Sequence, residues 1–324
     1  MEEIRSTTGR SDKPIGTSNI RHLLRAMRPR QWVKNVFVFS AIVFAKEHLL
    51  LDARAVGTIV TAFLLFCFVS SSIYLLNDLV DIEKDRQHPE KRFRPLPAGD
   101  LSPSLAFGAI GVVLPTCLAV IGYNIWAAPT PDKGWMWFAL VIGVYFVLQS
   151  SYTFGLKHVV LVDVFIIAAG FVLRAVAGAA VISVEITAWW ILSVFFLALF
   201  LALGKRRTEL QSLQQKAGDH RPILQEYSTT FLYYLLLIVV ACTIIVYSQA
   251  TFTAPMAQAM SYPYLILTTP LVVFALFRYL FLIIQNEESG DIADIIFQDR
   301  PLLATIVSWA TMVLMIKISL MVRG

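Results

Sequence analysis

The chain has 324 residues, of which 57% are hydrophobic and only 15% are charged. A soluble domain carries about 25% charged residues, so this composition excludes an ordinary soluble protein and indicates a membrane domain. The formal net charge of +5 does not indicate a nucleic-acid partner, because the basic residues follow the expected membrane topology. The three cysteines lie inside apolar runs and form no CxxC pair.

The N-terminal segment is polar and leads into a basic stretch. Residues 1–20 combine Ser, Thr, Gly and Pro with mixed charge, and they lack the apolar core of a signal peptide. We therefore expect a disordered tail over residues 1–20 and one transmembrane domain over residues 21–324. Residues 21–35 mix Arg and Lys with Leu, Met and Trp, which is typical of an interfacial helix.

Nine apolar segments follow, and most approach the about 20 residues that a helix needs to cross a bilayer. They cover residues 36–51, 55–76, 104–125, 135–153, 159–182, 187–203, 230–250, 262–284 and 302–321. The first and sixth are short enough to be tilted or partly re-entrant. The sequence predicts an all-α polytopic membrane protein, a bundle of about nine transmembrane helices around a cavity.

The positions of Lys and Arg orient this bundle. With nine spans, twenty of these residues fall on one side of the membrane and four on the other. The positive-inside rule then places the N-terminus in the cytoplasm, together with the loops that follow the second, fourth and sixth spans. The cavity is expected to face the cytoplasm, where soluble phosphorylated metabolites are found.

The end of the second span carries a cluster of acids. Asn77, Asp81 and Asp85 recur every four residues. Asp78 lies three residues before Asp81, so in a continuous helix all four side chains share one face. Carboxylates at the C-terminal end of a helix repel one another and oppose the macrodipole, and a cation relieves both effects. Because their oxygens suit a hard ion, the four are candidate Mg²⁺ ligands, with a solvated charged loop as the alternative.

Basic residues follow the acids within one short loop. They are Lys84, Arg86, Lys91, Arg92 and Arg94. Acid and base so close together fit a metal-bridged di- or polyphosphate better than a bare metal site.

These patterns resemble a known family. The pattern N-D-x-x-D-x-x-x-D at the end of the second span, followed by K-R-x-R-P-L, is similar to the UbiA-type intramembrane prenyltransferase superfamily. Residues 85–95 are similar to one branch, the decaprenyl-phosphate phosphoribosyltransferases, and the R-P-x-Q-W-x-K-N run over residues 28–35 resembles the same branch. The resemblance implies that Lys34 and Asn35 face the active-site cavity.

The fourth and fifth spans carry further candidates. The turn from Tyr152 to His158 resembles the Y-x-F-G-L-K-H turn of this branch, which implies that Tyr152 and Lys157 hold phosphate. An interfacial Tyr and a snorkelling Lys are the alternative. Asp163 and Arg174 are ionisable residues inside the fifth span, about three turns apart, so they cannot pair directly. Asp163 is expected to reach a ribose hydroxyl or a second metal, whereas Arg174 either serves the site or pairs with a neighbouring helix.

The connection after the sixth span departs from the superfamily. Members that use a prenyl diphosphate commonly carry a second Asp-rich motif there, whereas this chain has Lys205, Arg206 and Arg207. Basic residues in place of acids favour direct ion pairing to a phosphate over a second metal bridge. Ordinary positive-inside charge is the alternative. The last loop on this side, over residues 287–302, is acidic, and its role stays open.

The resemblance implies a Mg²⁺-dependent enzyme of a bacterial inner membrane. It would transfer 5-phosphoribose from 5-phosphoribosyl-1-diphosphate to a polyprenyl phosphate such as decaprenyl phosphate, and release diphosphate. In the family this step supplies a lipid-linked arabinose precursor for cell-wall polysaccharide. The candidate catalytic residues are Asp78, Asp81, Asp85 and Lys157. The candidate substrate-binding residues are Lys34, Asn35, Asn77, Lys91, Arg92, Arg94, Tyr152, Asp163, Lys205 and Arg206.

Two other functions were weighed against this hypothesis. An enzyme of the same fold would move a prenyl chain from its diphosphate to an aromatic or haem-type acceptor. A transporter or lipid-anchored scaffold is less favoured, because transporters often show repeats with paired broken helices, which this sequence lacks. The lipid bilayer is an expected partner, nucleic acid is not, and the sequence leaves a homo-oligomer open.

Overall fold

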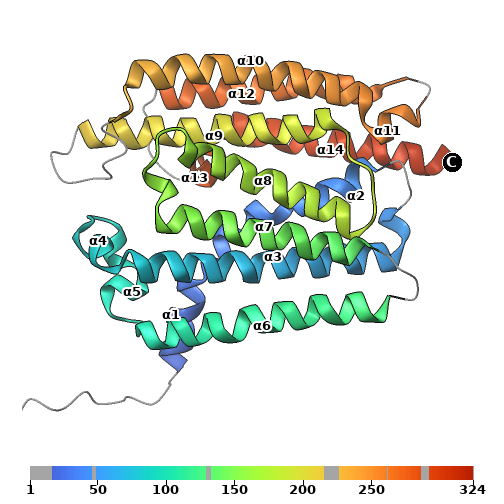
Figure 1. Ribbon diagram of the computed structural model, residues 1–324. Helices are drawn as coiled ribbons and strands as arrows, with labels where there is room; N and C mark the ends of the chain where they lie inside the picture. Colours follow the sequence, from blue (N-terminus) through green and yellow to red (C-terminus); the bar gives the residue numbers. More distant parts are fainter. Residues whose placement is uncertain are drawn as a thin grey trace, which may run out of the picture.

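The structure is a computed structural model that describes residues 17–45, 49–128, 133–214, 226–260, 262–285 and 292–323. Within these ranges the chain is helical, and its long helices lie antiparallel along one axis (Figure 1). In the part of the chain that the structure describes, eight helices are long and apolar enough to cross a membrane. The predicted all-α membrane bundle is confirmed.

The long helices are α3 (Ala53–Val80), α6 (Pro103–Ala127), α7 (Gly134–Phe154), α8 (Val162–Val181), α9 (Ala188–Gln214), α10 (Thr229–Thr253), α12 (Thr269–Gln285) and α14 (Arg300–Arg323). The short elements are α1 (Thr17–Ala26), η1 (Pro29–Phe39), α2 (Ser40–Phe44), η2 (Leu49–Leu51), α4 (Ile82–Gln87), η3 (Lys91–Phe93), α5 (Pro95–Ala98), η4 (Leu156–His158), α11 (Pro255–Gln258), η6 (Tyr264–Thr268) and α13 (Ile292–Gln298), where η denotes a 3-10 helix.

The first predicted span, residues 36–51, is replaced by a composite element that begins earlier. η1 is a 3-10 helix of 11 residues, and α2 continues it for 5 more. A 3-10 helix rises about 2.0 Å per residue and an α-helix about 1.5 Å, so the two together cover about 30 Å, the thickness of the hydrocarbon core. The start of this element could not be predicted from apolar runs, because η1 contains polar residues.

Contacts at both ends show that this composite element crosses the whole bundle. Arg28, just before η1, bonds Asp78 near the C-terminal end of α3. Ala45, just after α2, accepts a hydrogen bond from Lys317 near the C-terminal end of α14. These two helix ends lie at opposite ends of the molecule (Figure 1). η1 and α2 therefore supply the ninth crossing.

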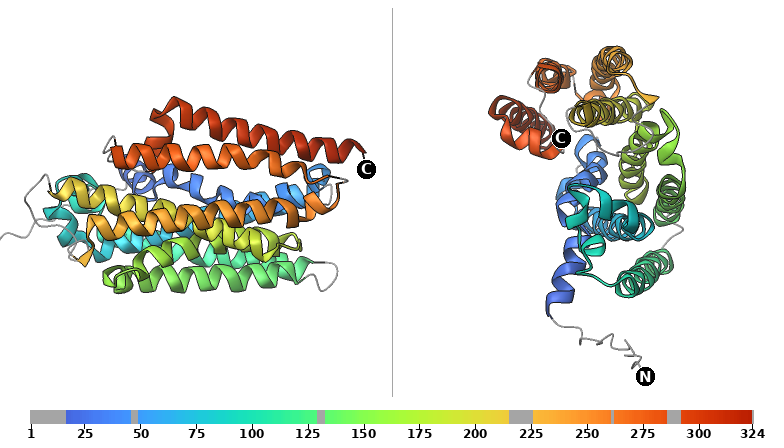
Figure 2. Two further views of the ribbon diagram at one scale, coloured as in Figure 1. Left: turned by 90° about the horizontal axis from the view of Figure 1, so that it is seen from above. Right: turned by 90° about the vertical axis from the view of Figure 1, so that its left-hand side faces the viewer.

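Close packing holds η1 against α3 and α8, inside the wall of long helices seen end-on in Figure 2. Val38 of η1 is fully buried. Gly178 of α8 makes this approach possible, because a Cβ at that position would lie 1.9 Å from the backbone oxygen of Val38. The sequence thus places a glycine where two backbones touch.

The short elements α4, η3 and α5 gather at the end of the bundle where α3 finishes (Figure 1). α1 packs against this end through Ala26 and Met27, while Ile20 and Leu24 remain more than half exposed, as suits an interfacial helix. α1 begins at Thr17, so the helix overlaps the last part of the tail predicted over residues 1–20, and residues 1–16 lie outside the described ranges.

Candidate active site

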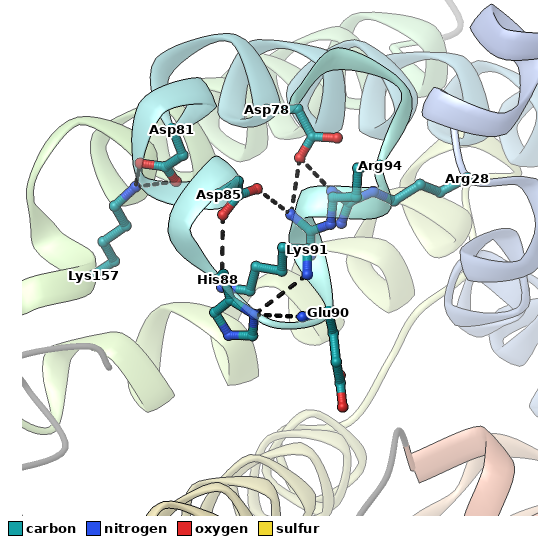
Figure 3. A network of polar contacts seen from close by, with 9 residues as sticks. All are labelled: Arg28, Asp78, Asp81, Asp85, His88, Glu90, Lys91, Arg94 and Lys157. Atoms are coloured by element: carbon teal, nitrogen blue, oxygen red, sulfur yellow. Dashed lines mark hydrogen bonds and ion pairs between the residues drawn. The ribbon is translucent and has the colours of Figure 1, made fainter. Parts of the chain in front are cut away.

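The acidic cluster does not lie on one continuous helix. α3 ends at Val80 and α4 begins at Ile82, and Asp81 between them has φ −98° and ψ 10°. Because the carboxylates oppose the macrodipole at a helix C-terminus, the helix is disfavoured at this point. The four side chains therefore do not share one face, because that required a continuous helix from Asn77 to Asp85. Asp81 points to one side, and Asp78 and Asp85 lie toward the other (Figure 3).

Asp78 and Asp85 converge on one arginine. Arg94 Nη1 donates to Asp85 Oδ2 at 2.7 Å and to Asp78 Oδ1 at 3.2 Å. Asp78 is 1% exposed and also accepts a hydrogen bond from Arg28, and Lys91 Nζ lies 3.9 Å from Asp85. Burial lowers the pKa of Arg94, and the neighbouring charge of Arg28 lowers it further. Two carboxylates are thus neutralised by three cations from separate turns of the chain.

Asp81 faces Lys157 across the site. Lys157 Nζ donates to its two carboxylate oxygens at 2.6 and 2.8 Å. The side chains are 11% exposed for Lys157 and 15% for Asp81, so water screens this pair far less than a surface pair. Lys157 lies in η4, between α7 and α8. The structure therefore brings this predicted phosphate ligand to the acidic cluster.

Arg28 belongs to the site although the sequence reasoning assigned it no role. Its φ of 55° and ψ of 61° are left-handed, which costs about 1–2 kcal/mol for a residue with a side chain. The guanidinium bonds Asp78 and lies 5.0 Å from the ring centroid of Tyr74. Its position as the first residue of the R-P-x-Q-W-x-K-N run is the signal that could have found it.

A second polar network lies buried between α7, α8 and α9. Asp163 is fully buried and accepts hydrogen bonds from Arg206 Nε at 2.6 Å and from Tyr227 Oη at 2.9 Å. Arg206 also donates to Glu209 at 2.5 Å and to Tyr152 Oη at 3.4 Å. Asp163, expected to reach a ribose hydroxyl or a second metal, is instead paired with Arg206. Sequence reasoning missed Tyr227, because nothing in its polar loop marks it.

Asn35 and Arg174 pair inside the bundle. Arg174 Nε donates to Asn35 Oδ1 at 2.7 Å, and the same guanidinium donates to Tyr145 Oη at 2.8 Å and to the Gly170 carbonyl at 2.7 Å. A buried guanidinium needs such acceptors, since an unpaired charge in the membrane interior is costly. Of the two alternatives for Arg174, pairing with neighbouring elements is the one observed. Asn35 is 1% exposed and serves this pair rather than an open cavity.

The other predicted ligands lie at the same end of the bundle with varied exposure. Lys34, Asn77, Lys91 and Lys205 are half-buried. Arg92 is exposed, and its guanidinium lies 4.8 Å from the ring centroid of Phe93. Arg207 is 9% exposed, and its Nε has no hydrogen-bond partner among the residues that the structure describes.

The acidic segment before the last span is described only in part. Residues 286–291 lie outside the described ranges. Beyond them, Asp299 caps α14 by accepting a hydrogen bond from Leu302 N at 2.8 Å, and Arg278 of α12 donates to it at 2.8 Å. The hydrogen bonds from Arg278 lower the pKa of Asp299. Residues 299–302, which read Asp-Arg-Pro-Leu, thus have a structural role: Asp299 ties α12 to the start of α14.

The donor chemistry of the acidic cluster fits a magnesium ion through two of its carboxylates. In the described part of the chain, no group of three or more His, Cys, Asp and Glu side chains is placed to hold a metal. Two carboxylates, those of Asp78 and Asp85, do meet at a single cationic nitrogen of Arg94. Mg²⁺ typically takes one or two protein carboxylates and fills its remaining positions with water and phosphate oxygens. Asp81 points away from this pair and bonds Lys157 (Figure 3).

The fold and this charged site define a class of protein. The sequence profile of the UbiA prenyltransferase family matches residues 35–297, and the chain belongs to this family. Among individual proteins, it is 37% identical to the decaprenyl-phosphate phosphoribosyltransferase of Corynebacterium glutamicum over 236 residues, which cover 73% of this chain and 68% of that protein. It is 31% identical to the protein of the same name from Mycolicibacterium smegmatis over 297 residues, 89% of each chain.

A solved structure has the same fold. The UbiA homolog from Archaeoglobus fulgidus, bound to GPP and Mg²⁺, matches with a TM-score of 0.65 over 92% of this chain and 99% of that one, at 18% identity. At this identity the match establishes the fold alone. The resemblance found in the sequence, both to the superfamily and to the phosphoribosyltransferase branch, is confirmed.

Proposed function

We propose that this protein transfers 5-phosphoribose from 5-phosphoribosyl-1-diphosphate to a polyprenyl phosphate and releases diphosphate. The observation that supports this proposal best is that Asp78 and Asp85 both bond Arg94 Nη1. Arg28 and Lys91 lie beside the two carboxylates. That arrangement suits a diphosphate and its metal ion. Relatives of this chain over most of its length are decaprenyl-phosphate phosphoribosyltransferases, which supports this donor and this acceptor.

The carboxylates of Asp78 and Asp85, with Asn77 beside them, would hold Mg²⁺, which supplies Lewis-acid neutralisation of diphosphate charge when bound. Lys157, Arg94 and Lys91 would bind phosphate oxygens, and Asp81, which pairs with Lys157, would orient it. The bond between ribose C1 and the diphosphate oxygen breaks, and the electron pair leaves with diphosphate. An anionic phosphate oxygen of the lipid forms the new bond to C1 and needs little help from a general base. The chain's contribution is therefore mainly positioning and electrostatic stabilisation.

The basic residues 205–207 of α9 have different roles: one is paired inside the protein, and another is assigned to a ligand. Arg206 is 2% exposed and neutralised by Asp163 and Glu209, so it is held in place rather than offered to a ligand. Lys205, which is half-buried, is the residue of the cluster that we assign to the lipid phosphate. A donor that is a prenyl diphosphate is not favoured, because this segment carries a buried arginine pair where such enzymes commonly have acids.

The site would face the cytoplasm of a bacterial inner membrane. In the sequence, the predicted spans leave twenty basic residues on the side of the acidic cluster and four on the other, which supports this orientation by the positive-inside rule. A soluble sugar diphosphate can then enter from water while the lipid enters from the bilayer. We place the catalytic domain over residues 21–324.

Transfer of labelled ribose phosphate tests the proposal directly. Purified protein in lipid nanodiscs, with Mg²⁺ and decaprenyl phosphate, should move label from 5-phosphoribosyl-1-diphosphate into a lipid-extractable product. Asp78→Asn should remove this turnover, whereas Glu83→Gln, which changes a carboxylate that is 80% exposed, should retain it. A parallel reaction contains a labelled prenyl diphosphate and an aromatic acceptor. Label that moves only in the parallel reaction would replace this function with general prenyl transfer.

A further inference from the structure

A cleft opens beside Asp78, on the side away from Lys157. Its volume is about 210 Å³, and its polar lining consists of Arg25, Arg28, Asp78, Glu90 and Arg94. The three arginines come from three separate segments: the end of α1, the residue before η1 and the residue before α5. We call this feature the arginine cleft.

Positive charge is concentrated in the arginine cleft beyond what its acids neutralise. One carboxylate oxygen, Asp78 Oδ1, accepts hydrogen bonds from both Arg28 and Arg94. Two guanidinium groups therefore crowd around a single carboxylate oxygen, where their positive charges repel each other. Arg25 is exposed at the mouth and adds a third positive charge. An anion with several oxygens would relieve this repulsion.

The strained backbone of Arg28 directs its guanidinium group toward Asp78. Its left-handed conformation persists beside Pro29, and Tyr74 and Asp78 hold the side chain in place. Arg28 and Arg94 are 24% and 29% exposed in their side chains, so both are partly dehydrated but still open to a ligand. Guanidinium forks in this setting match the planar pairs of oxygens that a phosphate presents.

We propose that the arginine cleft binds the 5-phosphate of the sugar-phosphate donor, through Arg25 and Arg28. This inference deepens the proposed function and rests on it. The donor carries two separate anionic groups, and Asp78 borders both the cleft and the carboxylate pair assigned to the diphosphate. A prenyl diphosphate has an apolar chain in place of a second phosphate, so the cleft selects a phosphorylated sugar over a prenyl group.

Calorimetry on the full chain in nanodiscs tests the cleft with two probes, ribose 5-phosphate and inorganic diphosphate with Mg²⁺. Arg25→Gln should weaken binding of ribose 5-phosphate about tenfold or more, as expected for a lost charged hydrogen bond, and leave diphosphate binding unchanged. Arg25→Lys should recover part of the loss. Arg21→Gln, one turn earlier on α1 and also exposed, is the matched control and should change neither affinity.

Arg28→Lys provides a second variant that keeps the charge beside Asp78 but removes the planar fork. It should weaken ribose 5-phosphate binding as well. The proposal is overturned if ribose 5-phosphate does not bind the wild-type chain, if both variants bind it normally, or if both lose diphosphate binding to the same extent. Arg25-dependent binding without any phosphoribosyl transfer would support the cleft while refuting the proposed reaction, so the two failures are distinguishable.

Discussion

Lys157 and Asp81 are 76 positions apart in sequence, yet they form the best-paired contact of the acidic cluster. Each carboxylate of the cluster is paired with a basic side chain of the protein, and these pairs offset the repulsion between the acids without a ligand. Any cation that binds these carboxylates must compete with Lys157, Arg28 or Arg94. The basic residues it displaces are then available for phosphate oxygens.

Lys157→Ala should weaken apparent affinity for the donor by about 1.5–3 kcal/mol, because one charged hydrogen bond to phosphate is lost. The same change leaves Asp81 without its cation. The double variant with Asp81→Asn should therefore show a clear non-additive coupling in steady-state kinetics. Lys84→Ala, an exposed lysine of α4, serves as the control. Additive effects of the two changes would contradict a direct functional pair.

Tyr227 fixes the start of α8 through its hydroxyl group. It donates to Asp163 and accepts from Leu161 N at 2.7 Å, and Leu161 has a φ of 66°. Tyr227→Phe should lower the stability of the protein by about 1–3 kcal/mol, because Asp163 and Leu161 lose a buried partner. Thermal unfolding measures this change. A variant that melts like the wild type would show that the network does not need the hydroxyl.

The titration of Tyr227 gives a pH prediction for the same variant. Burial raises the pKa of Tyr227 to about 12, from an unfolded value near 10. A raised pKa stabilises the folded state fully below about pH 10, and this stabilisation is lost as the pH rises toward 12. The wild-type melting temperature should therefore fall between these values by more than that of Tyr227→Phe. Equal slopes for both proteins would rule out this contribution.

The acidic residues could be found from sequence because their spacing is local, whereas their pairing with residues far along the chain could not. Arg28 lies 50 positions from Asp78, and Lys157 lies 76 from Asp81. Only folding brings such residues together. The sequence also could not separate the roles of residues 205–207, because consecutive residues on an α-helix point about 100° apart and three of them cannot serve one ligand. Arg206 accordingly turns to Asp163.

At the scale of elements, the contact between η1 and α8 determines where the N-terminal half of the site lies. Gly178→Ala places a methyl group against the Val38 backbone oxygen, at the 1.9 Å separation that an unshifted backbone would give. We expect a loss of about 1–3 kcal/mol from overpacking, because neither backbone can yield easily. Differential scanning calorimetry in detergent measures it. Gly143→Ala in α7, with open space at its Cβ, should be neutral or slightly stabilising.

If Gly178→Ala were as stable as Gly143→Ala, the close approach of η1 to α8 would be refuted.

The long helices could be predicted from apolar runs alone because each fills its span with hydrophobic residues. η1 could not, since Lys34 and Asn35 interrupt it and its 3-10 geometry gives no period of 3.6 residues. The break between α3 and α4 at Asp81 could not be predicted either, because the spacing of the carboxylates does not show at which residue their repulsion ends the helix.

At the scale of the whole molecule, the eight long helices and the η1–α2 element of the described chain would put the acidic cluster and the C-terminal end of α14 on opposite sides of the membrane. Single cysteines in a cysteine-free background test this arrangement. Substitutions at Arg92 and His158, both exposed at the site end, should react with an impermeant reagent only from the cytoplasmic side. A cysteine at Leu51, which is 74% exposed at the other end, should react only from outside. A cysteine at Arg21, which is exposed before η1, should react from the same side as one at Arg92, and labelling from the side of Leu51 would refute the ninth crossing.

The 3-10 geometry of η1 also restricts how this protein can change over evolutionary time. Side chains three apart are eclipsed in such a helix, so Trp32, Asn35 and Val38 form one straight column. Trp32 bonds Ser71, Asn35 bonds Arg174, and Val38 touches Gly178.

Deleting one residue early in η1 would turn everything after it by about 120° and bring Val36 to the place of Asn35. Arg174 would then face a hydrocarbon side chain inside the membrane. Aligned homologues should therefore tolerate substitutions across residues 29–39 but show no gaps there, while gaps accumulate in the loops at the two ends of the bundle.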